Sequence, residues 1–155
     1  MRAKDIMTDQ PVTVFEGATA AEAAQLMHAS GQGGLPVVDA AGQLLGIVDR
    51  LVLLRLILPK YAEDIGDLGF LPEDFKPFES RMEEIGRMLV RDVMRPSDVR
   101  ATEDTPVVEI AALMVTKQAS HVPVVREGRL VGIVAVQDIV DEIVWPHFRR
   151  DEEGE

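Results

Sequence analysis

The sequence predicts an α/β protein built from two copies of one unit. Three observations lead to this prediction: an ordered internal duplication, alternating strand-like and helix-like periodicities within each copy, and a glycine-containing hairpin at the same place in both. Asp5-Ile6-Met7 recurs 87 residues later as Asp92-Val93-Met94. Residues 42–48 recur 86 residues later as residues 128–134, with five of the seven positions identical. Matches in one order with a single small gap indicate a true duplication.

Each copy is predicted to contain a short strand, a helix, a two-stranded hairpin and a final helix. In the first copy these elements are expected at residues 12–14, 18–29, 35–39 with 44–48, and 49–58. In the second copy they are expected at residues 99–101, 105–117, 122–126 with 130–134, and 136–144. Thr105 followed by Pro106 matches an N-cap residue with proline at the first helical position.

The predicted domain organisation has four parts: a first repeat at 1–58, an insertion or linker at 59–90, a second repeat at 91–148 and an acidic tail at 149–155. The insertion has no counterpart elsewhere in the chain, and it holds Tyr61, Phe70, Phe75 and Phe78. An unstructured linker carries fewer aromatic residues. The insertion is therefore expected to be ordered, with packed aromatic rings and a helix over residues 79–89.

The composition argues against several classes of function. Hydrophobic residues make up 46% of the 155 residues, which is typical of a soluble globular protein. The formal net charge of −11 argues against nucleic-acid binding and against an anionic membrane surface. The absence of cysteine excludes disulfides and thiolate metal sites. The chain lacks a signal-peptide core and a membrane-length apolar run, so the expected location is the cytoplasm.

No constellation of residues predicts catalysis or metal binding. The three histidines, His28, His121 and His147, lack metal-ligand spacing. The serines lack a nucleophile-elbow context, and adjacent acids such as Glu83-Glu84 are typical of solvated faces. The glycines of residues 31–34 lack the Lys-Ser/Thr of a phosphate loop. The chain is therefore not predicted to be an enzyme, and an acidic-cluster hydrolase is the weakest alternative.

The final helix of the first copy is unusually apolar. From Leu51 to Leu58 only Arg55 interrupts the apolar residues. A helix without a polar face is buried on more than one side. Two interpretations follow: a central core helix, or a helix that contacts a second subunit.

In the second copy, an apolar strand leads directly into a helix with an acidic residue in its first turn. Gly132-Ile133-Val134 forms the strand part, and Asp138 is the acid. A carboxylate at this position is favoured by the helix dipole. Asp138 is therefore either only a dipole partner or one wall of a site for a polar small molecule.

The ordered set of motifs, present twice, resembles the CBS domain, named after cystathionine beta-synthase. The set consists of an Asp-x-Met opening, an apolar-Pro-Val-Val strand, a glycine hairpin, Gly-Ile-Val and a following acid. The resemblance covers residues 5–58 and 92–145, and a tandem pair is called a Bateman module. It implies two small α/β units related by a pseudo-two-fold axis, with clefts between them.

The resemblance also implies a ligand site. Family members commonly bind adenosine compounds, with a Ser or Thr hydroxyl for phosphate and an Asp for the ribose. Asp138 stands at the ribose position, but Ala135 replaces the hydroxyl and Gln137 lies between them. The implied base wall consists of Val99, Arg100, Val122 and Pro123, with His121 beside it. Phosphate would then depend on backbone N–H groups, on cations such as Arg100, Lys117, Arg126 or Arg129, or on His121. In the first copy Asp49 and Val52 occupy the two positions, so at most one competent cleft is expected.

Two hypotheses follow. The first is a non-catalytic regulatory module that binds AMP, ADP, ATP or S-adenosylmethionine in the cleft between the repeats and signals by a conformational change. It needs no obligatory cofactor, and the expected partners are a second copy, through apolar helices including the one from Leu51 to Leu58, and an unknown effector protein. The alternative is a ligand-free dimerisation or protein-interaction module.

Overall fold

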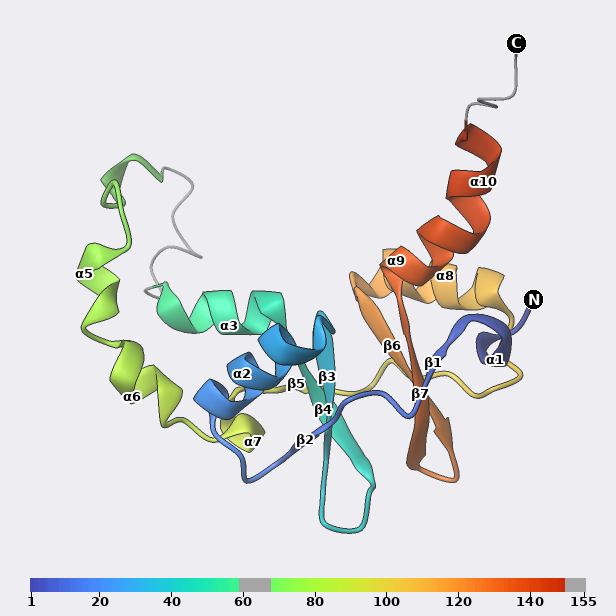
Figure 1. Cartoon of the computed structure of the whole chain (residues 1–155), viewed down its shortest axis with the longest axis horizontal. Coiled ribbons are helices and arrows are strands. Elements are labelled where there is room, and N and C mark those ends of the chain that lie inside the picture. The colour runs from blue at the N-terminus through green and yellow to red at the C-terminus, as the bar shows by residue number, and fades with distance from the viewer. Residues whose placement is uncertain (59–67, 150–155) are drawn as a thin grey trace. The chain divides into compact units, whose positions relative to one another are not determined.

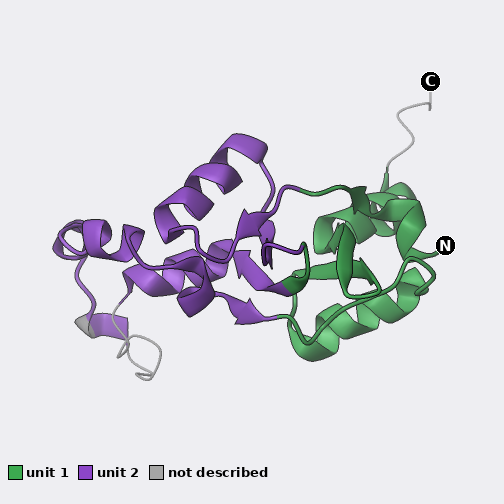
Figure 2. Ribbon diagram, turned by 90° about the horizontal axis from the view of Figure 1, so that it is seen from below, with its two compact units in different colours: residues 1–11, 42–44, 97–155 green, residues 12–41, 45–96 purple. Residues whose placement is uncertain are grey.

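The computed structural model describes residues 1–58 and 68–149, which form two compact units (Figures 1 and 2). The first unit contains Met1–Pro11, Gly42–Leu44 and Ser97–Glu155, and the second contains Val12–Ala41 and Leu45–Pro96. Neither unit is one continuous stretch. The unit that holds the second repeat also holds the opening segment of the chain, and the unit that holds the first repeat also holds the opening segment of the second copy.

The second unit is built on a four-stranded sheet in the order β2-β3-β4-β5 (Figure 1). β2 (Val14–Phe15) runs parallel to β3 (Gly34–Val38), and the helix α2 (Ala20–Ser30) connects them. β4 (Leu44–Asp49) leads into α3 (Arg50–Ile57). β5 (Arg95–Pro96) closes the sheet antiparallel to β4.

The ends of α2 are defined by local sequence. Thr19 accepts a hydrogen bond from the Glu22 N–H at 3.2 Å, and the Glu22 carboxylate accepts from the Thr19 N–H at 3.4 Å. This reciprocal pair satisfies two N–H groups that the helix leaves unpaired. The helix ends at Gly31, whose φ of 71° lies in the left-handed region that glycine adopts without a Cβ clash.

The first unit is built on a three-stranded sheet in the order β1-β7-β6. α1 (Ala3–Ile6) and β1 (Thr8–Asp9) open the chain, and α8 (Val107–Lys117) precedes the hairpin of β6 (His121–Arg126) and β7 (Arg129–Ala135). The predicted strand at 99–101 is wrong as a strand, because only Ala101 forms a bridge, with Val124. The predicted cap at Thr105 is also wrong. Pro106 is the N-cap, and the Thr105 hydroxyl accepts instead from the Thr102 N–H at 2.9 Å.

The last helix runs further than predicted. α9 (Val136–Ile139) continues as a π-helical turn (Val140–Val144) and then as α10 (Trp145–Phe148), whereas the sequence predicted an end at residue 144. Pro146 lacks an N–H and crowds the carbonyl one turn before it. The wider π-helical turn lies immediately before Pro146, where it relieves that crowding.

The described part of the insertion contains several short helices rather than one long one. They are η1 (Leu68–Phe70), α5 (Lys76–Glu79), α6 (Met82–Gly86) and α7 (Val90–Val93), so the single helix predicted at 79–89 is wrong. Phe75 and Phe78 meet edge to face with ring centroids 6.4 Å apart, yet Phe75 is 53% exposed. This pair is the aromatic contact found among the described side chains, which do not include those of Tyr61 and Phe70.

Two hydrophobic cores repeat each other position by position. In one core Val14, Leu35, Val37 and Val48 are buried, and in the other the duplicated positions hold Ala101, Val122, Val124 and Val134. Val90 of α7 belongs to the core of the first repeat, and Ala3 of α1 belongs to the core of the second. The predicted duplication is therefore visible in packing as well as in sequence.

The Gly-Ile-Val segment of each strand has glycine at its first position because an opening segment crosses the strand closely there. A Cβ at Gly46 would lie 2.3 Å from the Arg95 carbonyl oxygen and 2.8 Å from Met94 Sδ. A Cβ at Gly132 would lie 2.5 Å from Met7 Sδ. The methionines of the two Asp-x-Met motifs thus pack on the glycines of the other copy. None of the described helices is both long and apolar enough to span a membrane.

Candidate functional site

The residues predicted to bind a ligand all lie in the first unit, at the end of the β6–β7 hairpin away from its turn. In the ladder of this hairpin His121 pairs with Ala135, and Val122 pairs with Val134. The Ala101 N–H donates to the Pro123 carbonyl at 2.9 Å, which brings Val99 and Arg100 to the same strand. Gln137 and Asp138 follow in α9, directly after β7.

Asp138 is held at the start of α9 by one of its two carboxylate oxygens. Its Oδ2 accepts a hydrogen bond from the Ala135 N–H at 2.7 Å, and the residue is half-buried. Within residues 1–58 and 68–149, Oδ1 makes no hydrogen bond. The carboxylate therefore stabilises the helix N-terminus and still has one oxygen that can accept a hydrogen bond from a hydroxyl group. Both of the roles that the sequence left open are compatible with this geometry.

The two repeats cap their last helices in complementary ways. In the first repeat the N-cap residue Asp49 accepts from the Val52 N–H at 2.8 Å. In the second repeat the N-cap residue is Ala135, which has no acceptor, and the third helical residue, Asp138, accepts from its N–H instead. Each repeat thus keeps one half of a capping box.

The first repeat offers no ribose acceptor at the position of Asp138. Val52 stands there, is 5% exposed and belongs to the hydrophobic core. Asp49 is also buried, at 8% exposure, and its Oδ2 lies 3.6 Å from the Arg95 Nε. Its charge is therefore matched within the unit by Arg95.

Arg95 is a residue that sequence reasoning missed. It occupies the position of Thr8 in the duplicated frame, so nothing in the repeat indicated a cation there. Only the general rule that a buried carboxylate needs a partner could have pointed to it.

Half of the implied base wall is buried. Val122 and Pro123 are fully buried, so their side chains belong to the core. Val99 packs against the same core and is half-buried. His121 is half-buried, and its Nδ1 lies 2.9 Å from the Ser120 hydroxyl. The side chains of this group that remain at least partly exposed are those of Val99, Arg100 and His121, so these rather than Val122 or Pro123 are available to a ring.

The cations that could bind a phosphate differ in the hydrogen bonds and ion pairs that they already make. The Arg100 Nε donates to the Ser97 carbonyl at 2.8 Å, and its Nη2 donates to the Leu44 carbonyl at 3.1 Å. Arg126 forms an ion pair with Glu103. Among the described residues, Lys117 and Arg129 make no ion pair.

Their positions along the hairpin also differ. Arg126 pairs with Arg129 next to the turn, five residues from the pair of His121 and Ala135. At about 3.3 Å per residue this distance is roughly 16 Å. Lys117 ends α8 only four residues before His121, so it is the candidate cation best placed along the chain.

The CBS domain family model matches residues 3–59 and 90–144. The chain therefore belongs to the CBS domain family, and it contains a tandem pair. The resemblance stated from the motifs is confirmed, as is the α/β fold with two such repeats.

Relatives include both complete CBS proteins and parts of enzymes. A CBS domain-containing protein of Dictyostelium discoideum is 32% identical over 91% of this chain and 90% of its own length. Inosine-5'-monophosphate dehydrogenase of Methanocaldococcus jannaschii is 28% identical over 99% of this chain, but the chain spans only 26% of that enzyme. The solved structure of CBSX2 in complex with AMP has a TM-score of 0.70 and 22% identity, and the match covers 94% of this chain and 98% of that one. At that identity the likeness establishes the fold alone.

Proposed function

We propose that this chain is a non-catalytic regulatory module that binds an adenosine-containing ligand beside Asp138. The family contains pairs that carry such ligands, and CBSX2 with AMP is one of the same fold. The match to the dehydrogenase of Methanocaldococcus jannaschii covers about a quarter of that enzyme, which fits a regulatory part rather than a catalytic one.

The observation that carries the proposal is the uncommitted oxygen of Asp138. Its Oδ2 is fixed by the Ala135 N–H at 2.7 Å, which orients the carboxylate before a ligand arrives. Ribose offers two adjacent hydroxyl donors, and an ionised carboxylate is the acceptor that binds them most strongly. The partly exposed side chains of Val99 and His121 are available to a base.

The proposed site has few groups that could bind a phosphate. Ala135 has no hydroxyl, Arg126 pairs with Glu103, and Arg100 is bonded to two carbonyl groups. Lys117 is the remaining cation near this end of the hairpin. We therefore infer that affinity changes little with the number of phosphates, so that AMP, ADP, ATP and S-adenosylmethionine are all to be compared.

The ligand experiment is an isothermal titration of the protein with each of these four compounds. Asp138→Ala is expected to weaken binding by about tenfold or more, because a hydrogen bond to a charged group contributes roughly 1.5–3 kcal/mol. Asp138→Asn keeps an acceptor for the Ala135 N–H and removes the charge, so its loss is expected to be smaller. The matched control is Glu142→Gln, an exposed acid on the same helix, which should leave binding unchanged.

A titration without heat for any of the four ligands, or equal affinities for wild type and Asp138→Ala, would contradict the ligand proposal. Thermal melts of each variant show whether it is folded, so that a lost helix contact is not mistaken for a lost ligand contact.

We further propose that the module acts as a homodimer that uses α3. Leu51 and Leu54 remain 49% and 44% exposed on the chain, and only Val52 of this helix is buried. These exposures do not support the interpretation of α3 as a central core helix. A ligand that binds one arrangement of the dimer better than another would shift the population between them, which is the proposed signal to an effector protein.

A ligand-free interaction module is the second candidate. It is favoured by the missing hydroxyl at Ala135 and by apolar helix surfaces, such as Leu54 and Val140, that need no ligand to find a partner. Sedimentation with and without nucleotide separates the two candidates. In the ligand-free case the oligomer is unchanged by nucleotide and the titrations show no heat.

A further inference from the structure

The carboxamide of Gln32 pairs with both polar groups of the Val12 backbone. Its Nε2 donates to the Val12 carbonyl at 2.8 Å, and its Oε1 accepts from the Val12 N–H at 3.1 Å. Nε2 also donates to the carbonyl of Gly34, the first residue of β3, at 2.9 Å. These three hydrogen bonds fix the carboxamide, and they occupy the polar backbone groups of Val12 although Val12 itself is exposed.

The second repeat lacks this contact. In the duplicated frame Ala119 stands at the position of Gln32, and Val99 stands at the position of Val12. Alanine has no polar side-chain atom. Among the described residues, neither the N–H nor the C=O of Val99 makes a hydrogen bond. The two backbone groups that Gln32 covers in the first repeat are therefore without a protein partner in the described part of the second.

The strands that carry these backbone groups have the same register in both repeats. Two residues after each of the two valines, the chain forms a parallel bridge to the next strand: Val14 pairs with Val37, and Ala101 pairs with Val124. Both bridges lie at the same place in the duplicated frame. The difference between the repeats therefore comes from the side chain at position 32 or 119 rather than from the pairing of the strands.

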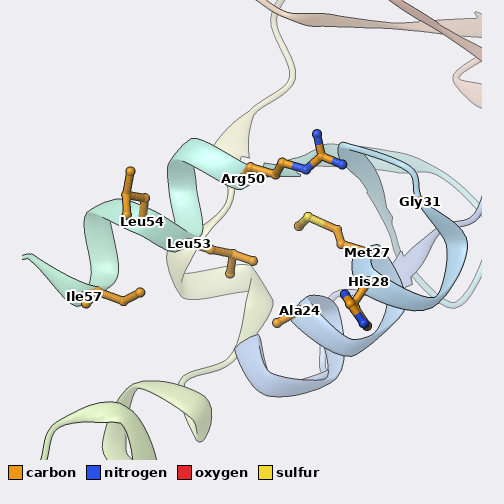
Figure 3. Close-up of a pocket in the computed structure, with 8 residues that line it drawn as sticks. All are labelled: Ala24, Met27, His28, Gly31, Arg50, Leu53, Leu54 and Ile57. Carbon is orange, nitrogen blue, oxygen red and sulfur yellow. The ribbon is translucent and has the colours of Figure 1, made fainter. Parts of the chain in front are cut away.

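The connection that carries this side chain also leaves its helix in the same conformation. Gly31 ends α2 (Figure 3) with a φ of 71°, and Gln118 ends α8 with a φ of 53°, both in the left-handed region. The residue at position 32 or 119 follows directly in each case. A glutamine placed at position 119 is therefore expected to reach the Val99 backbone as Gln32 reaches that of Val12.

A primary carboxamide and a nucleobase present the same kind of hydrogen-bonding edge. The carboxamide has an N–H donor beside an acceptor oxygen, and adenine has its N6–H donor beside the acceptor N7. A residue that pairs with one of them through its own N–H and C=O can pair with the other in the same way. The Gln32 carboxamide thus takes the place that a base would have on the Val12 backbone.

We propose that Gln32 closes the base-binding edge of the first repeat from within, and that Ala119 leaves the equivalent edge at Val99 open to the base of the ligand. The inference rests on the proposed adenosine site beside Asp138, and it identifies the residue that restricts base binding to one repeat. A tethered side chain competes at an effective concentration on the order of millimolar, so a metabolite at a lower concentration does not displace it.

Exchanging the two residues tests the proposal. In isothermal titrations with AMP and with S-adenosylmethionine, Ala119→Gln is expected to weaken binding by about tenfold or more, because the base loses two hydrogen bonds to the Val99 backbone. Ala119→Met is the matched control, since methionine has a similar length but cannot donate a hydrogen bond, and its affinity should stay within about threefold of wild type. Gln32→Ala is expected to leave the affinity of the second repeat unchanged.

Amide signals in NMR spectra report on each edge separately. In wild type the Val12 N–H is expected to exchange with solvent more slowly than the Val99 N–H, because the first is hydrogen-bonded to Gln32. Ala119→Gln should slow the exchange at Val99, and Gln32→Ala should speed it at Val12. Millimolar adenosine is expected to shift the Val12 signal in Gln32→Ala but not in wild type. A purely structural role of Gln32 would not produce that shift.

Each failure has a distinct meaning. If wild type binds AMP or S-adenosylmethionine and Ala119→Gln loses no more affinity than Ala119→Met, the inference is overturned and the proposed ligand site stands. A Val12 signal that adenosine leaves unmoved in Gln32→Ala overturns the inference as well, and it decides alone if thermal melts show that Ala119→Gln does not fold. A wild type that binds neither compound overturns the proposed function together with the inference.

Discussion

Gly46→Ala is expected to lower the free energy of unfolding by about 3 kcal/mol, at the upper end of what overpacking usually costs. The added Cβ would lie 2.3 Å from the Arg95 carbonyl oxygen, a backbone atom of the neighbouring strand β5. Relief requires β5 to move away from β4, with loss of the pairing of Gly46 with Pro96 and of Ile47 with Arg95. Chemical denaturation of the purified protein measures this change as a lower midpoint.

Gly132→Ala is the matched comparison, because the duplicated position differs in what the Cβ would meet. Its closest neighbour is Met7 Sδ at 2.5 Å, and the nearest backbone atom, the Thr8 carbonyl oxygen, is 3.1 Å away. A methionine side chain has three rotatable bonds and can turn aside. The expected cost is therefore smaller, about 1 kcal/mol. Equal costs at the two glycines, or a Gly46→Ala variant as stable as wild type, would show that β5 does not hold this position.

These two glycines also show how far the sequence could be interpreted. The duplication, the hairpins and the principal helices could be predicted, because apolar periodicity and matched motifs encode them locally. The sequence showed that Asp-x-Met and Gly-Ile-Val recur together, but not that each packs on the other copy. Contacts across about 40 residues or more leave no periodic signal, so Gly46 with Met94 had to be found in the structure.

The errors at element ends have local causes. Thr105 was expected to cap α8, but its hydroxyl turns back to Thr102 and leaves the cap to Pro106. The last helix was expected to end at residue 144, and Pro146, two residues later, ordinarily interrupts a helix. The π-helical turn before it allows the helix to continue to Phe148.

At the candidate site, the sequence predicted a set of residues but could not indicate their hydrogen-bond partners. The hairpin register pairs His121 with Ala135, and Asp138 bonds to the Ala135 N–H. The sequence predicted only that the helix dipole favours a carboxylate at Asp138. It did not predict the hydrogen bond that this carboxylate accepts from the Ala135 N–H. The partners of Arg100 and Arg126 could not be predicted, because the ends of long side chains can bond to any of several nearby carbonyls and carboxylates.

Asp49→Ala is expected to lower the free energy of unfolding by about 3 kcal/mol, because it removes a helix cap and one partner of a buried ion pair. The Asp49 carboxylate accepts from the Val52 N–H at 2.8 Å and lies 3.6 Å from the Arg95 Nε. The Arg95 Nε and Nη2 are buried and have no hydrogen-bond partner among the described residues. Without Asp49 nothing at Nε balances the charge, although the 34% exposure of the Arg95 side chain reduces the penalty.

Asp49→Asn separates the two contributions. Asparagine is as good an N-cap as aspartate, so this variant keeps the bond to the Val52 N–H and loses only the charge. Its expected cost is about 2 kcal/mol, and the remaining difference of about 1 kcal/mol from Asp49→Ala is the contribution of the cap. Adding Arg95→Met to Asp49→Asn should recover part of the loss, because an apolar side chain no longer needs a counter-charge. A double variant whose cost equals the sum of the singles would mean that the two side chains do not interact, and that α3 depends on Asp49 through its cap alone.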